Sequence, residues 1–139
     1  KYGYIPLNTS NKSEAAVGYG TLYGDLCGSL GTIGDVFKTD IYALARYINR
    51  NQIIIPENTI QKAPSAELRP NQKDQDSLPD YNELEENHSP EMIIKAGYPK
   101  ATVEKVIQMV KRNEYKRAQC PPIIKISKKA FGYGRKYPF

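Results

Sequence analysis

The stretch YIPLNTSNKSEAAVG, residues 4–18, joins a short apolar run to a polar turn and a helical pattern. The apolar run over residues 4–8 predicts a buried strand, although Pro6 is more usual at the edge of a sheet. Thr9 would then stand at the carboxyl end of that strand. The polar run that follows would not suit a core element, and it predicts a loop that brings polar groups into a site.

A helix is predicted over residues 12–18. Ser10 or Asn11 can cap it, because a side-chain oxygen accepts hydrogen bonds from the free amides of the first turn. Gly18 can end it, since glycine adopts the left-handed conformation that closes many helices. In a second interpretation, the amides of this helix face the phosphates of a nucleotide. The residue types alone favour the simple cap, with Glu14 completing it.

Apolar residues that recur every three or four positions predict longer helices over residues 38–50 and 101–113. A shorter helix is expected to start at Ser89 and to stop before Gly97. Residues 32–36 predict a second short strand. Residues 56–80, which are rich in proline and polar residues, predict a long irregular segment. The buried face of the first long helix is expected to comprise Ile41, Leu44, Ala45 and Ile48.

A length of 139 residues suits one domain. No apolar run approaches the length that spans a bilayer, and the first residues contain no signal-peptide core. The two cysteines, Cys27 and Cys120, form no CxxC pair. They are interpreted as reduced thiols of a cytoplasmic protein, without a disulfide framework or a zinc site.

Basic residues gather in the last part of the chain. Residues 100–139 hold eleven lysines and arginines but only the acids Glu104 and Glu114. Such a balance indicates a polyanionic partner, either nucleotide phosphates or nucleic acid, although a solvated basic surface explains it as well. Aromatic residues interleave with the basic ones, as in proteins that stack on bases. One hypothesis is therefore a non-catalytic, basic nucleic-acid-binding module that uses residues 100–139.

The remaining polar motifs each permit a functional and a structural interpretation. The glycine-rich stretch 18–34 lacks GxGxxG and GK[ST], and its spacing favours tight turns. Lys38 precedes a helix, where a lysine is unfavourable unless an anion lies nearby, so it is a candidate phosphate ligand or simply exposed. Residues 63–76 suit either a lid over a charged ligand or a plain surface loop. No nucleophile–base pair and no metal-ligand cluster is evident.

Several motifs, taken in order, resemble the glutamine-dependent NAD synthetase family over residues 4–138. SAELRPNQKDQDSLP and NEYKRAQCPP are the most specific. The others are NTSNKSEAAVGYGTLYGD, GDVFKTDIYALARYIN, IPENTIQKAP and KKAFGYGRKYP. The resemblance implies an α/β fold, namely the carboxyl-terminal portion of a doubly wound parallel-sheet domain of the adenine-nucleotide alpha-hydrolase type. This portion is itself expected to be mostly helix and loop.

The resemblance also implies a reaction. ATP adenylylates the carboxylate of deamido-NAD, and ammonia supplied from glutamine then replaces AMP to give NAD, with Mg²⁺ neutralising the phosphates. The SGGxDS phosphate loop of the family is absent from the sequence and is expected to lie before Lys1. Residues 1–139 are therefore expected to be the carboxyl-terminal part of the synthetase domain. The phosphate-loop half of the domain and a glutaminase domain would be its partners, and the chain would not catalyse alone. The protein is expected to be a homo-oligomer.

Individual site residues follow from the resemblance only. Lys38 is the expected catalytic residue, because its charge can stabilise the phosphates in the transition state. Glu14 is the expected metal ligand. Leu22 and Ser29 stand where short-form relatives carry lysine and aspartate, and the roles of Asp74 and Asp76 are left open. The expected ATP contacts are Thr9, Lys38 and Ser65. The expected deamido-NAD contacts are Glu14, Tyr19, Gly20, Thr21, Leu22, Tyr115 and Lys116.

Overall fold

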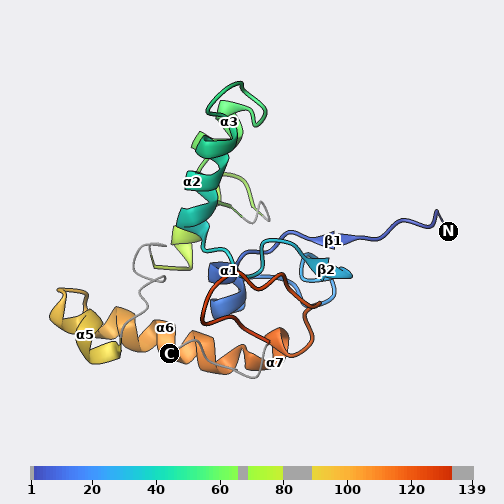
Figure 1. Cartoon of the computed structure of the whole chain (residues 1–139). Coiled ribbons are helices and arrows are strands. Elements are labelled where there is room, and N and C mark those ends of the chain that lie inside the picture. Colours follow the sequence, from blue (N-terminus) through green and yellow to red (C-terminus); the bar gives the residue numbers. More distant parts are fainter. Residues whose placement is uncertain (1, 66–68, 80–88, 133–139) are drawn as a thin grey trace.

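A computed structural model describes residues 2–65, 69–79 and 89–132 (Figure 1). Its sheet pairs β1 (Leu7–Asn8) with β2 (Leu30–Gly31) in parallel. Ile123 adds an isolated parallel bridge to Gly31. Parallel strands need a crossover connection, and α1 (Lys12–Val17) lies within the one that joins β1 to β2. This strand–helix–strand unit agrees with the α/β prediction.

The strand predictions need correction. A buried strand was expected over residues 4–8, but Tyr4 is 86% exposed and only Asn8 is buried. The second strand is Leu30–Gly31, and residues 32–36 form a turn. This turn allows the buried carboxylate of Asp35 to reach Lys12. The turn is further fixed because the amide of Lys12 donates to the carbonyl of Val36 at 2.9 Å.

The prediction for α1 is confirmed. Asn11 is its cap, with its side chain accepting from the amide of Glu14 at 3.0 Å. The Glu14 carboxylate accepts in return from the amide of Asn11 at 3.1 Å, which completes a capping box. Gly18 closes the helix in the left-handed conformation, with φ of 68°.

The other predicted helices are present within a turn of their expected bounds. They are α2 (Lys38–Ile48), α5 (Pro90–Lys95) and α6 (Lys100–Arg112), and Ser89 caps α5 as expected. The segment 56–80 is less irregular than predicted. It contains α3 (Glu57–Gln61) and the 3₁₀ turn η1 (Asp74–Asp76). The sequence did not predict α7 (Glu114–Arg117). Among the described residues, no helix has both the length and the apolar character to cross a membrane.

A small apolar core lies between α1 and α6. Val17 and Val110 are each only 2% exposed, and Leu78, which follows η1, joins them. The partly buried residues around this cluster are Ala16, Tyr19, Val106 and Met109. Segments far apart in the sequence therefore share one core.

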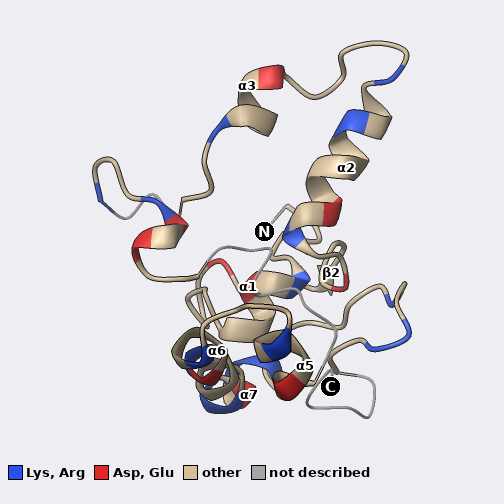
Figure 2. Cartoon of the chain, turned by 90° about the vertical axis from the view of Figure 1, so that its left-hand side faces the viewer, with Lys and Arg blue, Asp and Glu red and all other residues tan. Residues whose placement is uncertain are grey.

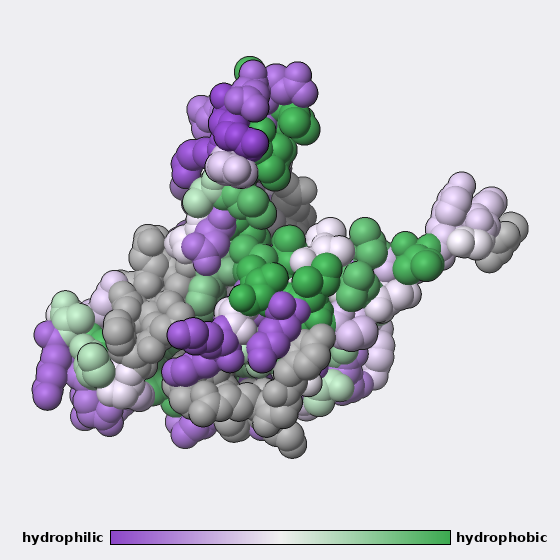
Figure 3. Space-filling view, in the orientation of Figure 1, coloured by the Kyte–Doolittle hydropathy of each residue, from purple (hydrophilic) through white to green (hydrophobic). Residues whose placement is uncertain are grey.

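Helix α2 projects away from this core (Figure 1). A loop leads from its far end to α3, which stands apart from α2 (Figure 2). The predicted buried face of α2 is confirmed only in part for this reason. Ala45 is buried and Ile41 and Ile48 are partly buried, but Leu44 is 45% exposed. Apolar atoms also cover the surface from β1 to the base of α2 (Figure 3).

Candidate functional site

The carboxyl end of β1 is held by a buried asparagine. The side-chain amide of Asn8 donates to the carbonyls of Asp25 (2.9 Å) and Cys27 (3.2 Å). Its oxygen accepts from the amide of Ser10 at 3.0 Å. Thr9 lies between these anchored residues and is exposed. The position expected to contact ATP is therefore accessible on a fixed backbone.

Two predicted site residues, Glu14 and Lys38, face each other. Their charged groups are 3.5 Å apart, and their side chains are about one-fifth exposed (20% and 21%). Lys38 begins α2, and its amide donates to the hydroxyl of Ser13 at 3.0 Å. Helix α2 therefore starts against the first turn of α1. A lysine at this helix start is offset by a carboxylate, which explains why it is tolerated there.

A buried ion pair, which the sequence did not indicate, underlies this arrangement. Lys12 and Asp35 lie 2.9 Å apart, with side chains only 2% and 0% exposed. The Lys12 ammonium also donates to the hydroxyl of Ser127 (2.9 Å) and to the carbonyl of Lys129 (2.7 Å). It lies 4.6 Å from the centroid of the Phe37 ring. The pair thus ties the late segment 126–129 to α1.

Backbone amides complete the environment of Asp35. Its carboxylate accepts from the amides of Ile126 (2.8 Å) and Ser127 (2.6 Å). Burial by itself would raise the pKa of Asp35, but these amides and the Lys12 ammonium outweigh it and hold the pKa below its ordinary value of 3.8. Asp35 is therefore a structural anion, which has its partners within the fold.

The predicted Lys116 lies against the loop that was expected to bind deamido-NAD. Its ammonium donates to the carbonyls of Gly18 and Gly20, both at 2.8 Å. The neighbouring Tyr115 is 55% exposed. The structure therefore brings Lys116 to the predicted loop, where it supports the backbone.

Tyr19 connects that loop to the segment around η1. The side-chain amide of Gln72 donates to the Tyr19 hydroxyl at 3.4 Å. Burial raises the pKa of Tyr19 above its ordinary value of 10.0, and the nearby Asp74 carboxylate raises it further. Asp74 is buried, whereas Asp76 is exposed and accepts from the amide of Lys73 at 2.9 Å. These contacts do not indicate a metal site.

The remaining residues of the predicted loop differ in their exposure to solvent. Leu22 is partly buried. Thr21 is exposed, and its amide donates to the Asp25 carboxylate at 2.5 Å. Ser29 is exposed as well, with its amide bonded to the carbonyl of Pro6 at 2.9 Å.

Ser65 lies in a separate hollow of about 630 Å³. Basic side chains surround it, since Lys62, Arg69 and Lys73 line the same hollow. This arrangement would suit an anionic group. Residues 66–68 of the predicted lid lie outside the described residues.

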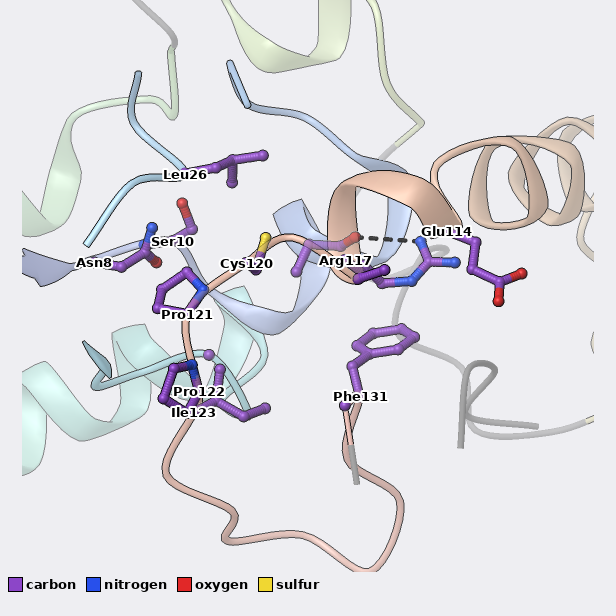
Figure 4. Close-up of a pocket in the computed structure, with 14 residues that line it drawn as sticks. Asn8, Ser10, Leu26, Glu114, Arg117, Cys120, Pro121, Pro122, Ile123 and Phe131 are labelled. Carbon is purple, nitrogen blue, oxygen red and sulfur yellow. Dashed lines mark hydrogen bonds between the residues drawn. The ribbon is translucent and has the colours of Figure 1, made fainter. Parts of the chain in front are cut away.

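A second cavity, of about 430 Å³, lies between β1 and α7 (Figure 4). Pro121, Pro122 and Ile123 form one wall, and Phe131 lies beneath Arg117 on the other. Cys120 also lines the cavity. Burial raises the pKa of its thiol above the ordinary 9.0, while Arg117 and Lys116 partly oppose this. Cys120 and Cys27 are both free cysteines, as the sequence predicted.

The described residues contain no cluster of three or more metal-binding side chains. The oxygens of Glu14 already contact the Asn11 amide and Lys38. An ion at Glu14 would therefore be held mainly by other groups. Mg²⁺ is commonly bound this way, by one or two carboxylates together with substrate phosphates.

The distribution of charge does not favour the nucleic-acid alternative. Acidic residues stand among the basic ones around α6 and α7 (Figure 2). Lys116 and Arg117 donate to carbonyls inside the fold. The part of the tail beyond residue 132 lies outside the described residues.

Comparisons with known proteins agree with the sequence motifs. The sequence model of the NAD synthase family matches residues 1–120. The glutamine-dependent NAD(+) synthetase of Aquifex aeolicus is 52% identical over 146 aligned positions, which cover 99% of this chain and 26% of that protein. That of Acinetobacter baylyi is 50% identical, with 99% and 27% covered. The chain thus spans about a quarter of the length of these curated relatives.

A solved structure, that of an NMN synthetase from Francisella tularensis, shares the fold. It superposes with a TM-score of 0.66 and 25% sequence identity, covering 91% of this chain and 46% of that one. The family resemblance predicted from the motifs is confirmed. The chain belongs to the NAD synthase family.

Proposed function

We propose that this chain forms the carboxyl-terminal part of the synthetase domain of a glutamine-dependent NAD synthetase. The observation that carries the proposal is the 52% identity, across 99% of the chain, to a protein of that name. The phosphate-loop half of the domain and a glutaminase domain would lie elsewhere in the full-length, cytoplasmic protein. The active protein would be a homo-oligomer.

The proposed reaction converts a carboxylate to an amide in two steps. An oxygen of the deamido-NAD carboxylate attacks the α-phosphorus of ATP, and the bond to pyrophosphate breaks. Ammonia derived from glutamine then attacks the acyl carbon, and AMP leaves with the bonding electrons. The chain would form one wall of the site around these groups.

The position of Lys38 supports its proposed role toward ATP. Its amide is anchored to α1 through Ser13, and its ammonium lies 3.5 Å from the Glu14 carboxylate. A phosphate group is a stronger partner for an ammonium than this long, partly solvated contact, so ATP can draw Lys38 from Glu14. Its charge would then offset the charge that develops on the phosphates. Thr9 and Ser65 would bind other parts of the nucleotide.

Glu14 would be exposed to the second substrate once Lys38 turns to ATP. It is the residue proposed to share Mg²⁺ with the phosphates, and the ion would neutralise part of their charge. On the deamido-NAD side, the loop from Tyr19 to Leu22 and the α7 residues Tyr115 and Lys116 would form the contacts.

The test is to measure NAD formation by the full-length protein that contains this chain. With ATP, deamido-NAD and glutamine or ammonia as substrates, Lys38→Ala is expected to lower kcat by about 10²–10³-fold, as loss of a transition-state charge contact does. Lys111→Ala removes an exposed lysine on α6 and is the matched control.

The outcomes separate clearly. Normal activity of Lys111→Ala together with a large loss in Lys38→Ala supports the proposal. A full-length protein that makes no NAD, or a Lys38→Ala protein that makes it at the wild-type rate, would refute it. Tight binding of single-stranded nucleic acid that weakens steeply with salt would favour the alternative instead.

A further inference from the structure

Arg117 joins parts of the chain that are distant in sequence. Its guanidinium donates to the carbonyls of Ala15 (3.4 Å) and Ala16 (2.7 Å), near the end of α1. It also donates to the carbonyl of Val110 in α6 at 2.5 Å. The ring of Phe131 lies under it, with 4.9 Å between the guanidinium carbon and the ring centroid (Figure 4). One side chain thus binds two helices and the late segment.

Most of these contacts satisfy carbonyls that a helix leaves open, although the carbonyl of Ala15 also accepts from the amide of Gly18. The last carbonyls of an α-helix have no partner within the helix, and a cation is favourable beside them. Asn113 acts in the same way on the next residue, with its amide donating to the carbonyl of Val17 at 2.9 Å. The side chains of α7 and the residue before it therefore form a tertiary cap on α1.

The loop expected to bind deamido-NAD begins where this cap ends. Lys116, the residue beside Arg117, holds the carbonyls of Gly18 and Gly20. The reach of Lys116 depends on where α7 lies against α1, and Arg117 fixes that position. Lysine at position 117 could not reproduce this effect fully, because an ammonium lacks the planar fork of donors that spans several carbonyls.

We propose that Arg117 is a positioning residue for the deamido-NAD-binding loop over residues 19–22, an inference that rests on the proposed function. Arg117 acts through the end of α1 and through Lys116, without touching the substrate. The proposed ATP contacts are anchored away from the end of α1 that Arg117 holds. Thr9 follows the fixed Asn8, and Lys38 is bonded to Ser13 in the first turn of α1, which its own capping box fixes. Loss of Arg117 should therefore affect the two substrates unequally.

The experiment uses the full-length protein and measures KM for each substrate separately. Arg117→Met keeps much of the side-chain length and removes the donors. We expect its KM for deamido-NAD to rise about tenfold or more, with KM for ATP changed less than about twofold, because misplacement of a contact by about an ångström weakens it strongly. The KM of Arg117→Lys for deamido-NAD should lie between those of the wild type and Arg117→Met. Arg112→Met, on the exposed surface of α6, is the matched control and should behave as wild type.

Hydrogen exchange provides a second readout. The amides of Tyr19 and Gly20 should exchange about tenfold faster in Arg117→Met than in wild type, since their loop loses its support. A merely structural role would lower the amount of active enzyme and leave both KM values unchanged. If Arg117→Met does not fold, the Arg117→Lys protein provides the test. Its KM for deamido-NAD should rise more than its KM for ATP.

Failure of this inference is distinct from failure of the proposed function. Active wild-type protein with unchanged KM values and unchanged exchange in Arg117→Met and Arg117→Lys would overturn the role of Arg117 alone. A wild-type protein that forms no NAD would overturn the proposed function and this inference together.

Discussion

Two regions of the molecule are stabilised in different ways. The α1 region, which comprises α1, α6, α7 and residues 123–131, is held by buried polar contacts between distant segments. The α2–α3 arm, residues 38–62, projects from it and keeps apolar side chains such as Leu44 and Ile53 exposed (Figures 1 and 3). Lys38 stands where the two regions meet.

The difference shows how a short helix can be made rigid. Six residues form α1, and so short a helix is not stable in isolation. It is fixed by its capping box at one end, by Asn113 and the α7 residue Arg117 at the other, and by the buried Lys12–Asp35 pair. The arm has a longer helix with fewer such contacts. The residues proposed to act chemically therefore depend on the rigidity of α1.

The largest expected effect comes from breaking the buried ion pair. Lys12→Met keeps the length of the side chain but leaves the Asp35 carboxylate buried without its cation. We expect a loss of about 3–5 kcal/mol in the free energy of opening of the α1 region, as for other buried pairs that lose one partner. Native-state hydrogen exchange of the α1 amides in the full-length protein measures it.

Exposed Lys100 is the matched control for this change. Its side chain is 73% exposed and lies 3.7 Å from Glu104 within the same helix. Lys100→Met should change the opening free energy by less than about 0.5 kcal/mol, because exposed pairs contribute little. Equal effects of the two substitutions would contradict the contrast between the regions.

A pair of glycines provides the next test. Gly18 and Gly3 share the same left-handed φ of 68°, but a Cβ on Gly18 would lie 2.2 Å from the side chain of Asn113, whereas one on Gly3 meets nothing within 4 Å. Gly3→Ala should cost at most about 1–2 kcal/mol for its backbone conformation. Gly18→Ala should cost more, about 3 kcal/mol, because Asn113 must also move.

Hydrogen exchange of the amides at the end of α1 reports the cost of Gly18→Ala. A smaller residue at position 113 should relieve part of it, so Gly18→Ala combined with Asn113→Gly should be less damaging than the sum of the single changes. Simple additivity would show that the close approach to Asn113 has no energetic consequence.

These contacts also explain which parts of the fold the sequence could predict. Local signals were sufficient for α1, α5 and α6, since caps and apolar spacing lie within each segment. The strand at residues 30–31 was missed because its pairing depends on β1 and Ile123, far away in the chain. The exposure of Leu44 on α2 was missed because a periodic pattern does not reveal whether a partner covers it.

The residues of the candidate site likewise fall into those that local motifs predicted and those that they did not. The motifs pointed to Glu14, Lys38 and Lys116, and the structure places Lys38 beside Glu14 and Lys116 against the predicted loop. Asp35 and Arg117 were missed, since their roles come from contacts made across many residues of chain. The sequence shows only that Asp35 is a charged residue among apolar ones and that Arg117 belongs to a basic segment. Such a signal is too general to identify the groups that they contact.

The smallest expected effect lies in the arm and completes the contrast with the α1 region. Leu44→Ala removes more carbon atoms than Val110→Ala, yet Leu44 is 45% exposed and Val110 is only 2% exposed. Val110→Ala should cost about 2 kcal/mol through lost burial and a small cavity. Leu44→Ala should stay within about 0.5 kcal/mol, since alanine also favours a helix. Hydrogen exchange of α6 and α2 amides in the full-length protein compares the two. A cost for Leu44→Ala that equals that for Val110→Ala would mean that another part of the full-length protein covers the arm, and the contrast drawn from this chain would then fail.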